Sequence, residues 1–134
     1  MVTGRCECGR VKYRIDGEIN DFSHCHCSQC RRLHGAAFAS FGGVKREDFS
    51  YTSGKREIAC YASSGKIDRF FCVNCGSSIL LEFSDEPESF FITMGTVDGN
   101  PKLPPAYHIF VASMASWHKF TDQAKRYDEF PDDS

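Results

Sequence analysis

The stretch Cys72-Val73-Asn74-Cys75-Gly76 does most to decide the fold of this 134-residue chain. A second stretch near the start, Cys6-Glu7-Cys8-Gly9, has the same character, because a cysteine pair is followed at once by glycine. Glycine lets the backbone curl so that amide N–H groups point at thiolates, as a zinc knuckle requires. One such motif also fits a redox dithiol, but a second pair favours zinc. Four thiolates would make a closed tetrahedral site that stabilises the fold, with the ligands Cys6, Cys8, Cys72 and Cys75.

A third group of cysteines lies in HCHCSQC, at residues 24–30. If this peptide is extended at its start, Cys25 and Cys27 point to one face and the two histidines to the other. After a turn, Cys30 can complete a tripod of sulfurs around one ion. Three protein ligands leave a fourth position open, which is typical of a catalytic zinc. We therefore expect the chemistry at Cys25, Cys27 and Cys30.

The alternative is a closed second site in which Cys60 or a histidine supplies the fourth ligand. Cys60 lies in EIACYA, with no glycine and no partner cysteine nearby. In a strand it would share a face with Ile58 and Ala62, which predicts a small core residue rather than a ligand.

Composition narrows the class of protein. The formal charge is −2, the pI is near 6.2, and 41% of residues are hydrophobic. This balance indicates a globular protein and argues against nucleic-acid binding, which needs a basic field. No apolar run approaches the roughly 20 residues that span a bilayer, and the first residues lack the apolar core of a signal peptide. We expect a cytoplasmic protein without membrane contact, in which eight cysteines serve as metal ligands or reactive thiols rather than disulfides.

Short alternating or aromatic segments separated by turn residues predict a mainly β fold in a single domain, residues 1–134. Residues 128–134 are acidic, and we expect them to form a frayed tail. The predicted strands are 10–15, 36–44, 57–62, 67–72, 78–83, 90–94 and 108–111, and the predicted helical turns are 29–34 and 112–117.

Several other side chains are candidates for supporting roles. Arg31 and Arg32 directly follow Cys30 and could offset thiolate charge, or could be a solvated surface pair. His34 and His108 could move a proton, although an ordinary hydrogen-bonded histidine is the simpler interpretation of each. Ser28 and Gln29 could donate to a sulfur, whereas Trp117 and the phenylalanines are expected in the core.

The whole cysteine pattern resembles the glutathione-dependent formaldehyde-activating enzyme family (the GFA family), which is related to centromere protein V. The matching pieces are GRCECG at 4–9, HCHCSQCRR at 24–32, SGKREIACYASSGKIDRFFCVNCGSSI at 53–79, GTVD at 95–98 and YHIFVASMASWH at 107–118.

This resemblance implies a β-tent fold of stacked short antiparallel sheets with few helical turns. It implies two zinc ions, a structural one on Cys6, Cys8, Cys72 and Cys75 and a catalytic one on Cys25, Cys27 and Cys30. It also implies a carbon–sulfur lyase that adds the thiol of glutathione to formaldehyde, giving S-hydroxymethylglutathione. Its partners would be a small-molecule thiol and an aldehyde, and the oligomeric state is left open, a homodimer being one option.

Other functions remain to be weighed against this one. A zinc-stabilised β-domain could bind a protein partner without catalysis, and HCHCSQC would then be a second structural site. A Cys–His hydrolase built on Cys30 and His34 conflicts with cysteines crowded for metal binding.

Overall fold

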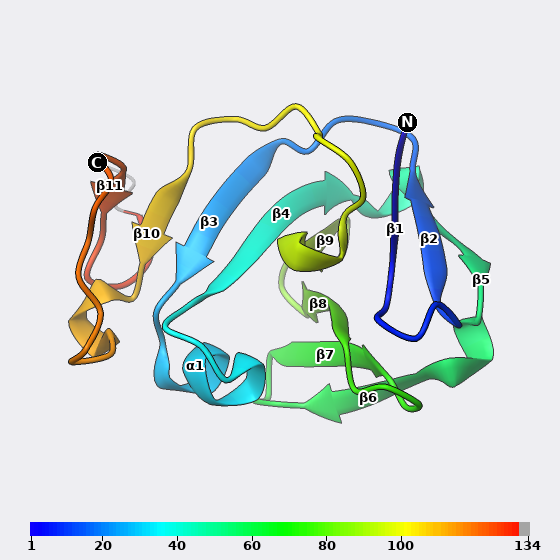
Figure 1. Ribbon diagram of the computed structural model, residues 1–134, viewed down its shortest axis with the longest axis horizontal. Helices are drawn as coiled ribbons and strands as arrows, with labels where there is room; N and C mark the ends of the chain where they lie inside the picture. Colours follow the sequence, from blue (N-terminus) through cyan, green and yellow to red (C-terminus); the bar gives the residue numbers. More distant parts are fainter. Residues whose placement is uncertain (132–134) are drawn as a thin grey trace.

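A computed structural model describes residues 1–131, which form two β-sheets, one α-helix and several 3₁₀ turns (Figure 1). The smaller sheet has the order β1 (Val2–Arg5), β2 (Lys12–Ile15), β5 (Phe49–Ser53). The larger sheet has the order β11 (Lys125–Arg126), β10 (Tyr107–Ile109), β3 (Asp21–Cys25), β4 (Ala39–Lys45), β9 (Ser89–Thr93), β8 (Ser78–Phe83), β7 (Ile67–Cys72), β6 (Ile58–Ala62). The helix is α1 (Ser28–His34), and the 3₁₀ turns are Arg46–Asp48, Lys55–Glu57, Met94–Thr96 and Val111–Ser113.

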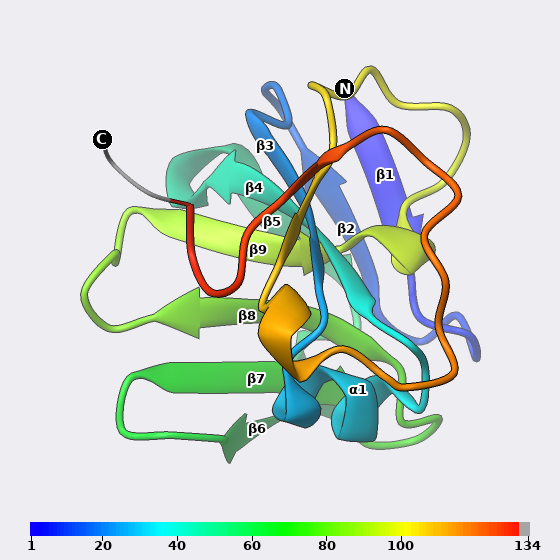
Figure 2. The same ribbon diagram turned by 90° about the vertical axis from the view of Figure 1, so that its left-hand side faces the viewer.

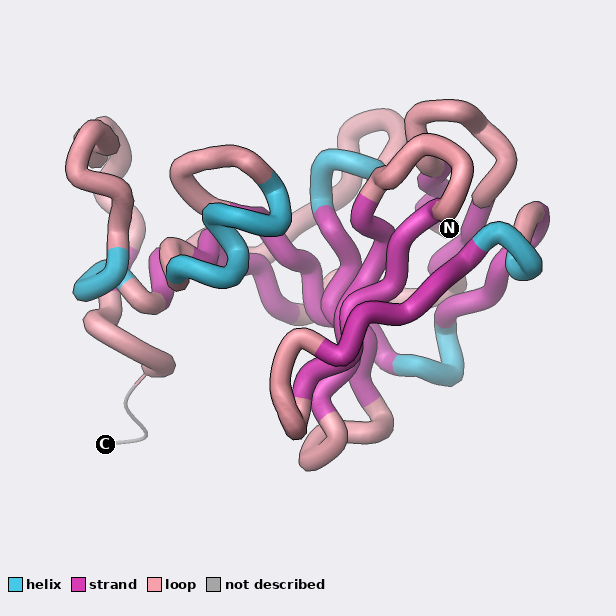
Figure 3. The backbone as a smooth tube through the Cα atoms, turned by 90° about the horizontal axis from the view of Figure 1, so that it is seen from below, coloured by secondary structure: helices cyan, strands magenta, loops and turns pink. Residues whose placement is uncertain are grey.

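The mainly β class is confirmed, since strands contain far more of the described residues than the helical segments do, and those segments are short (Figure 3). Most strand pairs are antiparallel as predicted, but β10 pairs in parallel with both β3 and β11. A parallel neighbour needs a long connection, and residues 110–124 provide one between β10 and β11. Among residues 1–131, no helix has the length and apolar character needed to cross a bilayer.

The predicted elements agree with the structure except at their ends and in one helix. Residues 112–117 form no α-helix, and only the 3₁₀ turn Val111–Ser113 lies there. The strand predicted at 108–111 is β10, and it ends at Ile109 because Phe110 has a left-handed backbone with φ 56°. Sequence patterns missed β1, β3, β5 and β11, of which β3 matters most for the site.

The larger sheet buries side chains on both faces. Val44, Ile79 and Ile92 lie on the face that packs against Tyr13 and Ile15 of the smaller sheet, in the first core. The opposite face carries a second cluster of six buried residues, Cys25, Cys30, Ala39, Phe41, Leu81 and Ile109. Because successive strand residues point to opposite faces, one sheet supplies both clusters.

The acidic end of the chain is held at the edge of this sheet as far as the structure describes it. Phe110 N–H donates to the Glu129 carbonyl at 3.1 Å, and Val111 N–H donates to the Tyr127 carbonyl at 3.0 Å. The segment therefore lies along β10, on the side of the molecule that faces the viewer in Figure 2. The rest of the predicted frayed tail, residues 132–134, lies outside the described residues.

We predict that Gly54→Ala destabilises the protein by about 3 kcal/mol. Gly54 has φ +75°, and a Cβ there would lie 2.0 Å from the Arg10 carbonyl oxygen. Urea unfolding monitored by circular dichroism measures the loss. Gly65→Ala is the matched control, because its Cβ meets no atom within 4 Å. Equal unfolding midpoints for the two variants would contradict this account of the turn.

Candidate metal centre and adjoining cavity

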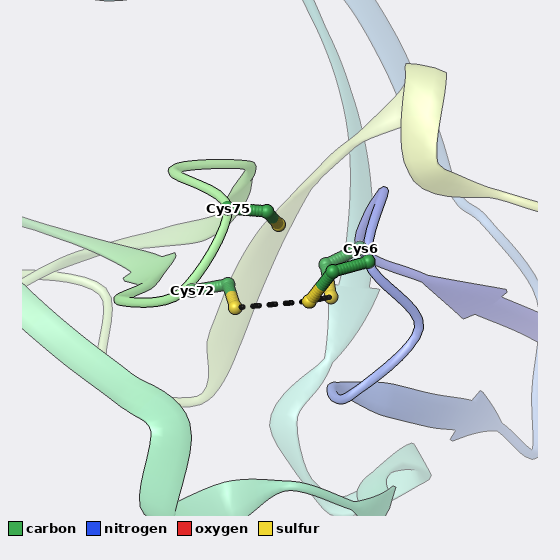
Figure 4. Close-up of side chains that lie close together, drawn as sticks. Cys6, Cys72 and Cys75 are labelled. Atoms are coloured by element: carbon green, nitrogen blue, oxygen red, sulfur yellow. Dashed lines mark hydrogen bonds between the residues drawn. The ribbon is translucent and has the colours of Figure 1, made fainter.

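Four cysteines from the two sheets meet at one point. Cys6 and Cys8 lie in the loop between β1 and β2, Cys72 is the last residue of β7, and Cys75 lies in the turn between β7 and β8. Their sulfurs all lie within 4.8 Å of one another (Figure 4). Gly9 and Gly76 follow the two pairs with φ of 79° and 80°, so the left-handed conformation expected of the knuckle glycines is confirmed.

The spacing of these sulfurs fits a tetrahedral metal ion. Zn–S bonds of about 2.3 Å at tetrahedral angles place two sulfurs about 3.8 Å apart. The Sγ atoms of Cys6 and Cys8 are 3.5 Å apart, and those of Cys8 and Cys72 are 3.8 Å apart. Cys6 and Cys72 are fully buried. Four-sulfur coordination would leave no position for a further ligand, so this cluster is suited to a structural ion.

The second cluster forms where β3 ends and α1 begins. Cys25 is the last residue of β3, Cys27 is the N-cap of α1, and Cys30 lies in the first turn of the helix. The Cys27 sulfur accepts the Cys30 N–H at 3.3 Å, which satisfies one of the free amides of the helix start. The three Sγ atoms lie within 4.8 Å of one another. These sulfurs could hold a second metal ion.

In the part of the chain that the structure describes, no fourth Cys, His, Asp or Glu side chain joins this group. Cys60 lies on the edge strand β6 opposite Phe70, on the sheet face away from Arg69. The geometry therefore does not favour Cys60 as a ligand. The expectation that Cys60 is a core residue is wrong, because β6 has no outer neighbour and the side chain is exposed.

The three-cysteine cluster lies at the wall of a cavity of about 1090 Å³. The strand residues around this cavity belong to one face of the larger sheet, since they alternate along each strand. They come from six strands: Asp21, Ser23 and Cys25 of β3, Phe41 and Gly43 of β4, Ile67 and Arg69 of β7, Leu81 and Phe83 of β8, Ser89 and Phe91 of β9, and Tyr107 and Ile109 of β10.

Arg69 is the cation at the sulfurs, and sequence reasoning missed it. Its Nη2 donates to Cys30 Sγ at 3.5 Å, and its Nε donates to Ser63 Oγ at 3.0 Å. Arg31 and Arg32, which adjoin Cys30 in the sequence and were candidates for this role, do not line the cavity. Only the pairing of distant strands brings Arg69 to the site. The one signal in the sequence was a lone cation in a mostly apolar strand.

Of the three thiols in the cluster, Cys27 is the one whose pKa is lowered. The pKa of its thiol lies far below the usual range, first because the Cys25 side chain donates to its sulfur, and then because that of Cys30 does. The Cys30 N–H and the charge of Arg69 lower this pKa further. Since metals bind thiolates rather than thiols, the cluster is electrostatically prepared for a cation.

The histidines of HCHCSQC lie on the other side of the sheet from the sulfurs. Nε2 of His26 and Nδ1 of His108 are 2.8 Å apart, and His108 Nε2 donates to Asp122 Oδ2 at 3.0 Å. Burial, followed by the nearby His108, lowers the pKa of His26 to about 4. His108 does not border the cavity, because its strand neighbours Tyr107 and Ile109 do. The simpler interpretation of His108, a hydrogen-bonded structural histidine, is confirmed.

His34 does not line the cavity either. It lies in the last turn of α1, with its ring edge-on to Phe41 at 5.8 Å, and it is absent from the cavity wall. Burial, followed by the charge of Arg69, lowers the pKa of His34. Gln29 lies at the cavity but is bound to the Ser63 carbonyl and Arg69 rather than to a sulfur.

A profile of the family described as "Glutathione-dependent formaldehyde-activating enzyme" matches residues 1–113, which include all seven clustered cysteines. The chain belongs to this family. A Schizosaccharomyces pombe protein named "uncharacterized lyase" is 28% identical over 89 residues, which are 66% of this chain and 63% of that protein. The chain therefore spans somewhat less than two thirds of this relative's length.

The fold also matches a crystal structure of a Rhodobacter sphaeroides protein. The TM-score is 0.63 at 23% identity, covering 73% of this chain and 89% of the other. This similarity concerns the fold alone.

The family profile ends before residues that complete the site in this member. Asp122, which binds His108, and Phe130, which lines the cavity, both follow residue 113. The C-terminal segment thus adds support on both faces of the sheet edge formed by β10.

We predict that Asp122→Asn lowers the free energy of unfolding. The difference in this free energy between wild type and variant should not shrink between about pH 8 and pH 5. The hydrogen bond from His108, followed by that from Ala124 N–H, lowers the pKa of Asp122 from its ordinary 3.8. Since a lowered pKa stabilises the fold above the ordinary value, the benefit is lost only as the pH falls below 3.8. Urea unfolding at several pH values measures the difference.

Asp128→Asn serves as the control, because that side chain is exposed and makes no hydrogen bond within residues 1–131. If wild type and Asp122→Asn became equally stable to urea as the pH was lowered from about 8 to about 5, the Asp122 carboxylate would not be the cause of the difference.

Proposed function

We propose that this chain is a zinc-dependent carbon–sulfur lyase that adds a thiol, such as glutathione, to formaldehyde or a related aldehyde, and that catalyses the reverse cleavage. One observation carries the proposal: three sulfurs meet at a cavity wall, and no fourth protein ligand joins them among residues 1–131. Family membership and the relative named as a lyase support a reaction of this class.

The two clusters would hold two zinc ions with different roles. Cys6, Cys8, Cys72 and Cys75 would bind the structural ion, and Cys25, Cys27 and Cys30 the catalytic one. A zinc ion on the three cysteines would supply one position for a further sulfur and would keep a substrate thiol deprotonated at neutral pH. The donor sets fit this assignment, because thiolate sulfur is a preferred ligand of zinc.

The reaction balances without an added oxidant or reductant. The thiol sulfur forms a bond to the carbonyl carbon, the C=O π pair moves to oxygen, and that oxygen takes the proton that the thiol released. In the reverse direction the C–S bond breaks and its electron pair returns to sulfur. The proton then passes from the hydroxyl to the thiol.

Arg69 would offset the charge that this chemistry accumulates. Three thiolates already carry one more negative charge than Zn²⁺ neutralises, and a substrate thiolate adds another. The Arg69 guanidinium lies 3.5 Å from Cys30 Sγ and is held by Ser63. The Ser28 hydroxyl lines the same part of the cavity and could donate to the oxygen as it gains charge. The cytoplasmic location remains a prediction from cysteine content.

We predict that the purified protein binds two equivalents of zinc and that Cys27→Ser retains the fold with one equivalent. Cys27 belongs to the cluster at the cavity, whereas the other cluster joins the two sheets. Cys72→Ser should fail to fold, because Cys72 is buried in the first core. Mass spectrometry of native protein, with circular dichroism, measures both properties. Cys60→Ser is the control and should retain two equivalents, whereas loss of one would place Cys60 in the ligand set.

The experiment that tests the activity is exchange spectroscopy by NMR on glutathione and formaldehyde at equilibrium with their adduct. The zinc-loaded protein should accelerate exchange by at least about tenfold over the uncatalysed reaction, and Cys27→Ser should lose this acceleration. In cobalt-substituted protein, glutathione should change the thiolate-to-metal absorption. No acceleration and no spectral change with any thiol would indicate a non-catalytic binding module for a protein partner.

A further inference from the structure

The cavity beside Cys25, Cys27 and Cys30 is much larger than an aldehyde of one carbon requires. Its volume of about 1090 Å³ lies at the upper end of the range for drug-sized ligands. It extends along β3 from Cys25 to Asp21, which are four residues apart. At about 3.3 Å per residue, this distance is about 13 Å. The cavity can therefore hold a whole organic thiol with its sulfur at the cysteines.

Between these two ends the cavity is lined by apolar side chains. Phe41, Leu81, Phe91 and Ile109 contribute surface from four different strands. They are partly or fully buried, and their packing around Cys25 and Cys30 makes one continuous cluster. An apolar surface of this kind gains free energy only when an apolar body displaces water from it.

Two aromatic rings complete the cavity from the sheet edge. Phe110 and Phe130 both line it, and their rings meet edge-on with centroids 4.8 Å apart. Phe110 is the one residue other than glycine in 1–131 with a positive φ, at 56°. Bulky residues rarely adopt this conformation, and strained residues cluster at ligand sites. This backbone conformation ends β10 at Ile109, and the Phe110 side chain lines the cavity.

The charges around the cavity do not suit a carboxylate. Of its basic residues, Arg69 is bound to Cys30, Gln29 and Ser63, and Lys66 pairs with Asp85 at 4.0 Å. The acidic residues that line the cavity are Asp21, Asp85 and Glu86. Since Lys66 and Asp85 pair with each other, the lining leaves two acids, Asp21 and Glu86, and one cation, Arg69, which is held at the sulfurs. Glutathione has two carboxylates and one ammonium group, so its body would meet uncompensated negative charge.

We propose that this cavity takes an uncharged thiol with an apolar body the size of a substituted benzene ring, in preference to glutathione. The inference rests on the proposed function in one respect, that the thiol sulfur is the atom that approaches the cysteines. The apolar walls bind the body, and the acidic rim excludes carboxylates. The adduct with an aldehyde forms at the sulfur end.

The test compares four thiols by titration calorimetry on zinc-loaded protein: benzyl mercaptan, 4-(mercaptomethyl)benzoate, 2-mercaptoethanol and glutathione. The first should bind at least about tenfold more tightly than 2-mercaptoethanol, because its ring buries apolar surface. It should bind about fivefold more tightly than the benzoate, and salt should reduce this second difference because it screens the charge. Equal affinities, or tighter binding of glutathione than of benzyl mercaptan, would overturn the proposal.

Two variants locate the effect within the cavity. Phe130→Ala should lower the affinity for benzyl mercaptan by about fivefold and leave that for 2-mercaptoethanol unchanged. Trp117→Ala is the matched control, since Trp117 is 70% exposed, Phe130 is 56% exposed, and only Phe130 lines the cavity. Asp21→Asn keeps an acceptor for the Tyr107 hydroxyl, 2.7 Å away, but removes the charge. Asp21→Asn should raise the affinity for 4-(mercaptomethyl)benzoate and leave the affinities for the uncharged thiols unchanged. No change in either variant would place the binding elsewhere.

Cobalt absorption separates this inference from the proposed function. A preference for benzyl mercaptan by calorimetry, without any spectral change, would keep the apolar cavity and refute sulfur binding at the metal. A spectral change of equal size and midpoint for all thiols would support sulfur binding at the metal and refute the preference for an apolar thiol.

Discussion

The meeting of four sulfurs from two separate sheets is the constraint on which the rest of the structure depends. Cys6 and Cys72 are fully buried and belong to the same core as Tyr13, Ile15 and Ile92. Thiolates in such a core are costly unless a cation compensates their charge. The smaller sheet meets the turn after β7 at this point, so the packing of the sheets and the chemistry of the donor set depend on each other.

The shape of the cavity also depends on the four-sulfur cluster, because β7 links this cluster to the cavity wall. Cys72 ends this strand at the first cluster, and Arg69, three positions earlier, reaches Cys30 of the second. The strand therefore spans the space between the two clusters. Because β7 pairs with β8 and β8 with β9, its position also sets where Leu81 and Phe91 lie in the cavity wall.

The sequence allowed prediction of the two cysteine groups and of the fold class because short cysteine spacings have few geometric solutions. Alternation separated Cys25 from His24 as a strand requires, and Cys27 and His26 continue this alternation in the extended backbone just beyond β3. Arg69 and Phe130 were not predictable in this way. Each reaches the site through pairing between segments distant in the chain, and a lone cation in a mostly apolar strand does not by itself place Arg69 at the sulfurs. Cys60 was misplaced because its strand pattern does not reveal that β6 is an edge.

The C-terminal segment, residues 114–131, separates the shape of the cavity from the arrangement of the clustered cysteines. It lies beyond the matched family profile, supports His108 through Asp122, and brings Phe130 to the cavity. None of the clustered cysteines lies within it. Mutations in this stretch can therefore alter what enters the cavity while the sulfur chemistry stays intact. In evolutionary terms, gene duplicates could diverge in the molecules they accept through substitutions in this segment, with both cysteine clusters kept in every intermediate.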